Sequence, residues 1–142
     1  MEEQQNITES KPKRPQLLTI LCILTFIGSG FGVFVFFIVA VNYEGTMEIM
    51  RTVYANMPEA RFLLDAPRDF FLISFIISAS SVMGAVLMWN LRKTGFHIYT
   101  SAQLINLILP FIYFGGETNP FLNILLTALF VYLYARNLQF MH

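Results

Sequence analysis

The amino-acid sequence predicts an all-α polytopic membrane protein, with four transmembrane helices in an up-down bundle and a short amphipathic extracytoplasmic helical segment. Of the 142 residues 56% are hydrophobic and only 13% are charged, about half the charged share of a soluble domain. Fifteen Phe and seven Met are too many large apolar side chains for so short a chain to hide from water. Two long apolar runs are joined by only Arg92-Lys93-Thr94-Gly95, which predicts a helical hairpin because helices satisfy their own backbone in hydrocarbon.

The N-terminal residues 1–15 are polar and carry two prolines, which predicts a disordered cytoplasmic tail. The first span is expected at 16–41, about 39 Å long as a helix. A basic cluster before an apolar run is also typical of a signal peptide, with Gly28-Ser29-Gly30 as a cleavage site. The apolar run continues unbroken through Val41, which favours a retained span.

Small residues in the first span predict a helix-packing face. Gly28 and Gly32 are four residues apart, a spacing that lets a neighbouring helix approach closely. A local bend is the alternative interpretation of these glycines. The single cysteine, Cys22, cannot form an internal disulfide and is expected to be a small buried apolar residue.

The extracytoplasmic loop is expected at 42–66. Met47, Met50 and Met57 recur at helical spacing, which predicts a short amphipathic helix along the membrane interface or capping the bundle. A docking surface for a partner protein is the alternative. Pro58 is expected to end this helix and begin a second helical turn, because proline is tolerated at a first helical position.

The second span is expected at 67–91. Small side chains spaced along one face of this span predict close contact with a neighbouring helix. These residues are Ser74, Ser78, Ser81 and Ala85.

The third span, expected at 96–114, is the least apolar. Tyr99, Gln103, Asn106 and Pro110 project to a common side of a helix. Amides facing lipid are costly, so this side is expected to face the bundle interior. There the two amides either hydrogen-bond to another helix or line a small polar pocket.

The fourth span is expected at 120–138, after a return loop beginning at Gly115-Gly116, and a short tail follows at 139–142. Asn123 and Thr127 lie one turn apart on this span. They are the expected partners of Gln103 and Asn106.

Basic residues predict the orientation. Six lie on the side of both termini and three on the other side, so the positive-inside rule places both termini in the cytoplasm. The six are Lys11, Lys13, Arg14, Arg92, Lys93 and Arg136.

The middle of each expected span lacks Asp, Glu, Lys and Arg. Proton-coupled pumps and intramembrane hydrolases need ionisable groups or metal ligands at that depth. The two histidines, His97 and His142, are interfacial and terminal. We therefore expect no enzyme activity, catalytic residue, metal or cofactor. Nine basic and nine acidic residues cancel, which argues against nucleic acid as a partner.

Two segments, Lys13–Gly30 (KRPQLLTILCILTFIGSG) and Leu91–Tyr99 (LRKTGFHIY), resemble small bacterial four-span membrane proteins of unknown function. The resemblance covers the first span and the central hairpin, roughly a third of the chain. It implies four spans and a bacterial inner-membrane location, and it brings no active site.

Two functions remain open. The first is a non-enzymatic structural, scaffold or accessory subunit whose partners are the lipid bilayer and other membrane proteins or a second copy. The alternative is a small carrier or channel for a neutral or weakly polar solute. A wet cavity at mid-depth reaching Gln103, Asn106, Asn123 and Thr127 would favour the carrier, whereas interdigitated side chains would favour the scaffold.

Overall fold

The computed structural model describes residues 13–115 and 121–142. Most of the predicted tail, the return loop after Gly115 and the expected start of the fourth span at residue 120 therefore lie outside the described residues. In the described ranges every regular element is helical and no strand occurs. Four helices are long and apolar enough to cross a membrane. The predicted all-α four-span fold is thereby confirmed, and the chain is a multi-pass membrane protein.

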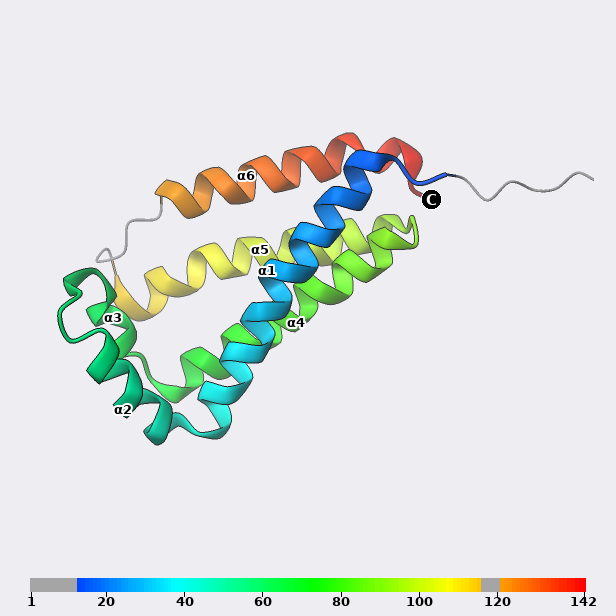
Figure 1. The fold of residues 1–142 in the computed structure, drawn as a ribbon. Coiled ribbons are helices and arrows are strands. Elements are labelled where there is room, and N and C mark those ends of the chain that lie inside the picture. Colours follow the sequence, from blue (N-terminus) through cyan, green and yellow to red (C-terminus); the bar gives the residue numbers. More distant parts are fainter. Residues whose placement is uncertain (1–12, 116–120) are drawn as a thin grey trace, which may run out of the picture.

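The four long helices begin and end near the predicted bounds. They are α1 (Gln16–Val41), α4 (Arg68–Trp89), α5 (Lys93–Phe114) and α6 (Phe121–Arg136), with a 3₁₀ turn, η2 (Leu138–Phe140), after the last. Helix α4 packs along both α1 and α5, and α6 lies on the far side of α5 and α1 from α4 (Figure 1). Helix α5 begins three residues earlier than predicted, because only Arg92 takes the extended conformation that precedes the helix.

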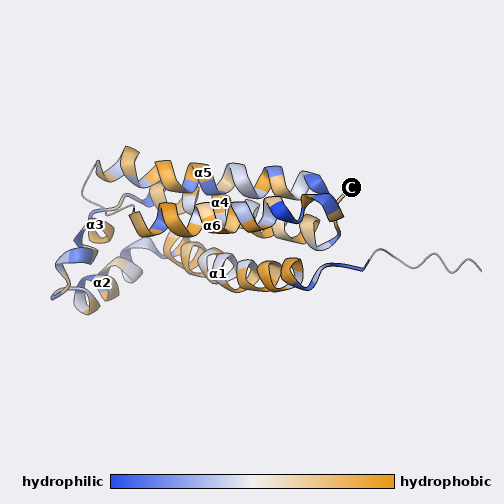
Figure 2. Cartoon of the chain, turned by 90° about the horizontal axis from the view of Figure 1, so that it is seen from above, coloured by the Kyte–Doolittle hydropathy of each residue, from blue (hydrophilic) through white to orange (hydrophobic). Residues whose placement is uncertain are grey.

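The connection between α1 and α4 is itself helical, with α2 (Tyr43–Val53), η1 (Pro58–Ala60) and α3 (Arg61–Leu64). Pro58 opens η1, where its missing N–H has no partner to lose. Met47 is the buried residue of α2. Tyr43 fixes the start of α2, because its hydroxyl donates a 2.6 Å hydrogen bond to the Ala66 carbonyl. Figure 2 shows hydrophilic and hydrophobic residues mixed along this segment.

Helices α4 and α5 touch backbone to backbone at two glycines. A Cβ added at Gly84 would lie 2.8 Å from the Tyr99 nitrogen, and one added at Gly95 would lie 2.7 Å from the Met88 nitrogen. These distances are too short for any side chain. The crossing of α4 and α5 therefore depends on Gly95. This residue was predicted to belong to the connection between the two spans, but it lies in the first helical turn of α5.

Two hydrophobic clusters lie toward opposite ends of the bundle. The first is built around Leu18, Met88 and Tyr134 and joins α1, α4, α5 and α6. The second is built around Phe70 and Leu109, and its described members come from α1, α2, α4, α5 and the segment before α4. Among the described residues, α6 thus joins these clusters only through the first one.

The tail after α6 is tied to the α4–α5 turn. The His142 N–H donates a 2.8 Å hydrogen bond to the Leu91 carbonyl, and the Lys93 N–H donates one of 3.2 Å back to the His142 carbonyl. Met141 is buried against the first cluster. These contacts add a second attachment at the end where α6 already meets the core.

Candidate binding cavity

A cavity of about 380 Å³ lies between the two clusters and is bounded by α1, α4, α5 and α6. It is partly open, and its lining mixes amides, hydroxyls and glycines with apolar side chains. The polar and small lining residues are Thr25, Gly28, Ser29, Gly32, Ser78, Tyr99, Gln103, Asn106, Asn123 and Thr127.

Helical periodicity explains why these residues meet. Tyr99, Gln103, Asn106 and Pro110 recur at four, three and four residues, so they share one side of α5, and all four line the cavity. Asn123 and Thr127 are four residues apart, so they share one side of α6, and both line the cavity together with Leu126 and Phe130. The four predicted polar residues therefore face a single space.

Among the described residues, only Gln103 of these four has a side-chain hydrogen bond to the rest of the protein. The Gln103 amide donates to the Ser81 hydroxyl at 3.3 Å, so its partner is on α4 and not on α6. The side chains of Asn106, Asn123 and Thr127 make no hydrogen bond to any described residue. An amide or hydroxyl without a partner costs several kcal/mol in hydrocarbon. These groups need water or a bound molecule beside them.

One end of the cavity is closed by a buried polar pair. The hydroxyls of Thr25 and Tyr134 are 2.7 Å apart and hydrogen-bonded. The Tyr134 ring packs edge-on against Tyr99 with 4.9 Å between ring centroids. Cys22 lies beneath them, and its thiol is 3.7 Å from the Ala85 carbonyl oxygen. Tyr134 and Thr25 anchor α6 to α1 at this point.

The sequence analysis missed this anchor. Tyr134 lies eleven residues after Asn123 and seven after Thr127, which is the same side of a helix. That spacing could have predicted that Tyr134 lies on the same side of the fourth span as Asn123 and Thr127.

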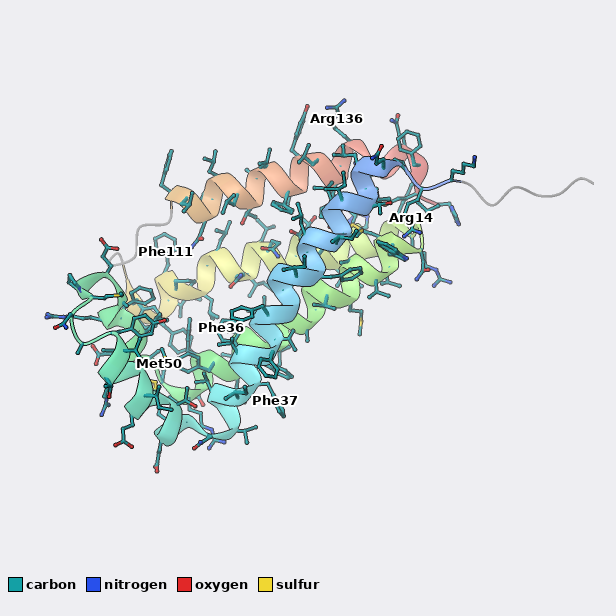
Figure 3. The ribbon with its side chains drawn as sticks, viewed as in Figure 1. Arg14, Phe36, Phe37, Met50, Phe111 and Arg136 are labelled. Carbon is teal, nitrogen blue, oxygen red and sulfur yellow. The ribbon has the colours of Figure 1, made fainter. Side chains whose placement is uncertain are left out.

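The other end of the cavity is bounded by Phe36 of α1, which is labelled in Figure 3. Its ring packs on Phe71 with 6.3 Å between centroids, within the second cluster. Helix α6 contributes nothing to this cluster among the described residues. Phe121 and Leu122 at the start of α6 are 72% and 63% exposed. The cavity therefore lies between the Thr25–Tyr134 pair and Phe36.

The two predicted packing glycines have different surroundings. A Cβ at Gly32 would lie 3.3 Å from the Ser78 hydroxyl, so α1 and α4 approach closely there. A Cβ at Gly28 would meet no atom within 4 Å. The structure thus places Gly28 on the cavity wall and not in a contact between helices.

The remaining predicted packing residues belong to α4. Ser74, Ser81 and Ala85 are buried within the bundle, and Ser78 lines the cavity beside Gly32. The Ser81 hydroxyl accepts the hydrogen bond from the Gln103 amide, and the Ala85 backbone carbonyl accepts one from the Cys22 thiol. This strip of α4 therefore meets both α1 and α5.

The chemistry of the cavity follows from its lining. No residue that lines it carries a charge at neutral pH. Within the described ranges no three His, Cys, Asp or Glu side chains lie together as a metal site would require. The lining offers hydrogen-bond donors and acceptors from amides and hydroxyls, together with aromatic and aliphatic surface. It suits an uncharged polar molecule.

Known proteins add nothing to this geometry. The chain matches no protein-family model, no curated protein and no solved structure. The structure shows four helices of membrane-spanning length, and the comparisons identify no family. The bacterial inner-membrane location stays a prediction.

Proposed function

We propose that this protein is a small carrier or channel for uncharged polar solutes, with the cavity between α1, α5 and α6 as the solute site. One observation supports this above the others: Asn106, Asn123 and Thr127 face a common space of about 380 Å³, and their side chains have no hydrogen-bond partner among the described residues. A space of this size holds on the order of ten water molecules. A purely structural bundle would bury these side chains against each other or replace them with apolar residues.

The proposal includes binding and passage without catalysis. The lining has amides and hydroxyls but no carboxylate, histidine or lysine to act as an acid or base. Proton-driven transport needs an ionisable group at depth, so we propose passive movement of the solute down its gradient. Both termini are proposed to be cytoplasmic, since Arg14 and Arg136 lie at the same end of the bundle (Figure 3).

A second candidate is the scaffold or accessory subunit. The observation that favours it is the first part of α6, where successive large side chains such as Leu122 and Leu125 are more than half exposed. A helix of a partner protein could pack there in place of lipid. This candidate predicts that filling the cavity has no effect on solute movement.

The test uses proteoliposomes and two matched substitutions. Gly28→Leu places a side chain in the cavity, whereas Gly30→Leu makes the same change on the same helix, away from the cavity lining and with no atom within 4 Å of the added Cβ. Swelling in glycerol or urea gradients is followed by light scattering. We expect the wild type and Gly30→Leu to swell faster than empty liposomes, and Gly28→Leu to match empty liposomes.

The stability of the same variants separates occlusion from misfolding. Replacing an unhindered helical glycine gains up to about 1 kcal/mol, so both variants are expected to unfold no more easily than the wild type in detergent. Equal swelling of the wild type and Gly28→Leu would reject the solute site. Destabilisation by Gly28→Leu alone would show that Gly28 packs against a helix.

A further inference from the structure

A second hollow lies between α4 and α5, away from the solute cavity. Its volume is about 410 Å³ and its lining is mostly apolar. The lining residues are Ile76, Ile77, Ser80, His97, Ile98, Ser101, Ala102 and Ile105. At about 100° per residue, Ile98, Ser101 and Ile105 point away from the cavity side of α5. This groove therefore faces the surroundings of the bundle, which in a membrane are lipid.

Basic and imidazole side chains lie at one end of the groove. His97 lines it, and Lys93 lies one turn earlier on the same side of α5. Arg92 precedes Lys93, and all three side chains are exposed. The sequence has no Asp or Glu between Asp69 and Glu117, so the α4–α5 hairpin supplies no carboxylate to pair with them. An anion from outside the hairpin fits this end.

We propose that the groove binds one anionic phospholipid, with its phosphate at Lys93 and His97 and an acyl chain along the four isoleucines. The lining runs from His97 to Ile105, which is about 12 Å along a helix. This arrangement matches the amphipathic form of a phospholipid, with a charged head at the interface and hydrocarbon toward the bilayer centre. The proposal is independent of the solute site.

A second copy of the chain fits the groove less well. Two copies inserted in the same orientation would bring their basic ends together, and like charges repel. Asp69 of α4 lies at the end of that helix away from Lys93, so two copies in the same orientation place no acidic side chain of a span beside Lys93. An anionic lipid provides both the hydrocarbon and the negative charge.

The test is native mass spectrometry of the full chain in detergent with equimolar palmitoyl-oleoyl phosphatidylglycerol and phosphatidylcholine. We expect the wild type to retain one phosphatidylglycerol in preference. The double variant K93Q with H97Q is expected to lower that preference about fivefold, which is about 1 kcal/mol for the lysine near the membrane surface. Lys13→Gln removes an exposed basic residue elsewhere and is expected to keep the preference.

The acyl part of the site is tested separately. Ser101→Phe fills the groove from an exposed position, and Leu104→Phe adds a ring to an exposed position of α5 outside it. We expect Ser101→Phe to reduce retention of both lipids and Leu104→Phe to change neither. Equal retention of the two lipids by the wild type, or no effect of Ser101→Phe, would overturn the proposal. A dimer that Ser101→Phe abolishes would also overturn it in favour of a second copy.

Discussion

Replacing Gly95 with valine is expected to destabilise the bundle by about 3 kcal/mol, the upper end of the range for an overpacked site. The first atom of any side chain there would lie 2.7 Å from the Met88 nitrogen and 2.7 Å from the Leu87 Cβ. Backbone atoms in the middle of a helix cannot move aside, so α4 and α5 must separate along their crossing. The measurement is the free energy of unfolding in mixed micelles titrated with sodium dodecyl sulfate.

The matched control is Gly30→Val, the same change at a spanning position where the added Cβ has no neighbour within 4 Å. We expect its unfolding free energy to stay near the wild-type value. Gly84→Val is expected to behave like Gly95→Val, because its Cβ would lie 2.8 Å from the Tyr99 nitrogen. If Gly95→Val unfolds like the control, the two helices do not touch as described.

Replacing Tyr134 with alanine is expected to release α6, at a cost of about 3–5 kcal/mol. Tyr134 is fully buried, its hydroxyl is 2.7 Å from that of Thr25, and its ring packs on Tyr99. Helix α6 enters no other described cluster, so few contacts replace these. We expect amide hydrogen exchange to rise along α6 while α4 and α5 stay protected.

Tyr132→Ala is the control for this prediction, since Tyr132 is on the same helix and 60% exposed. Its effect on unfolding is expected to be within about 0.5 kcal/mol. A result in which both variants loosen α6 equally would mean that Tyr134 is not the anchor. A result in which exchange rises equally in α4, α5 and α6 would mean that the four helices unfold as one unit.

The fold was predictable because membrane spans are encoded locally. Length, apolar composition and the short turn at Arg92-Lys93 each follow from a continuous segment of sequence, and no contact between segments is needed to recognise them. The polar side of α5 was predictable for the same reason, since Gln103 and Asn106 share a helix face. The spacing of residues along one helix is enough to predict which of them share a face.

Contacts between helices were not predictable in this way. Gln103 was expected to pair with α6, but its amide donates to Ser81 of α4. Gly28 and Gly32 look alike in sequence, yet only Gly32 approaches another helix closely. Both outcomes depend on how α6 is placed against α1 and α5, to which it is attached through Tyr134 and through the tail that follows it. The placement of α6 involves residues from several helices, so no single segment of the sequence predicts it.

The central claim is that the polar cavity contains water at mid-membrane depth, and cysteine labelling tests it directly. Cysteine is introduced at Asn106 in one variant and at Leu104, which lies on another side of α5 and outside the cavity lining, in a second. Native Cys22 is buried and gives the background. N-ethylmaleimide reacts with the thiolate, which forms only where water reaches the sulfur. We predict that Asn106→Cys is modified in intact membranes while Leu104→Cys stays at background. Equal lack of reaction at both positions would contradict the account.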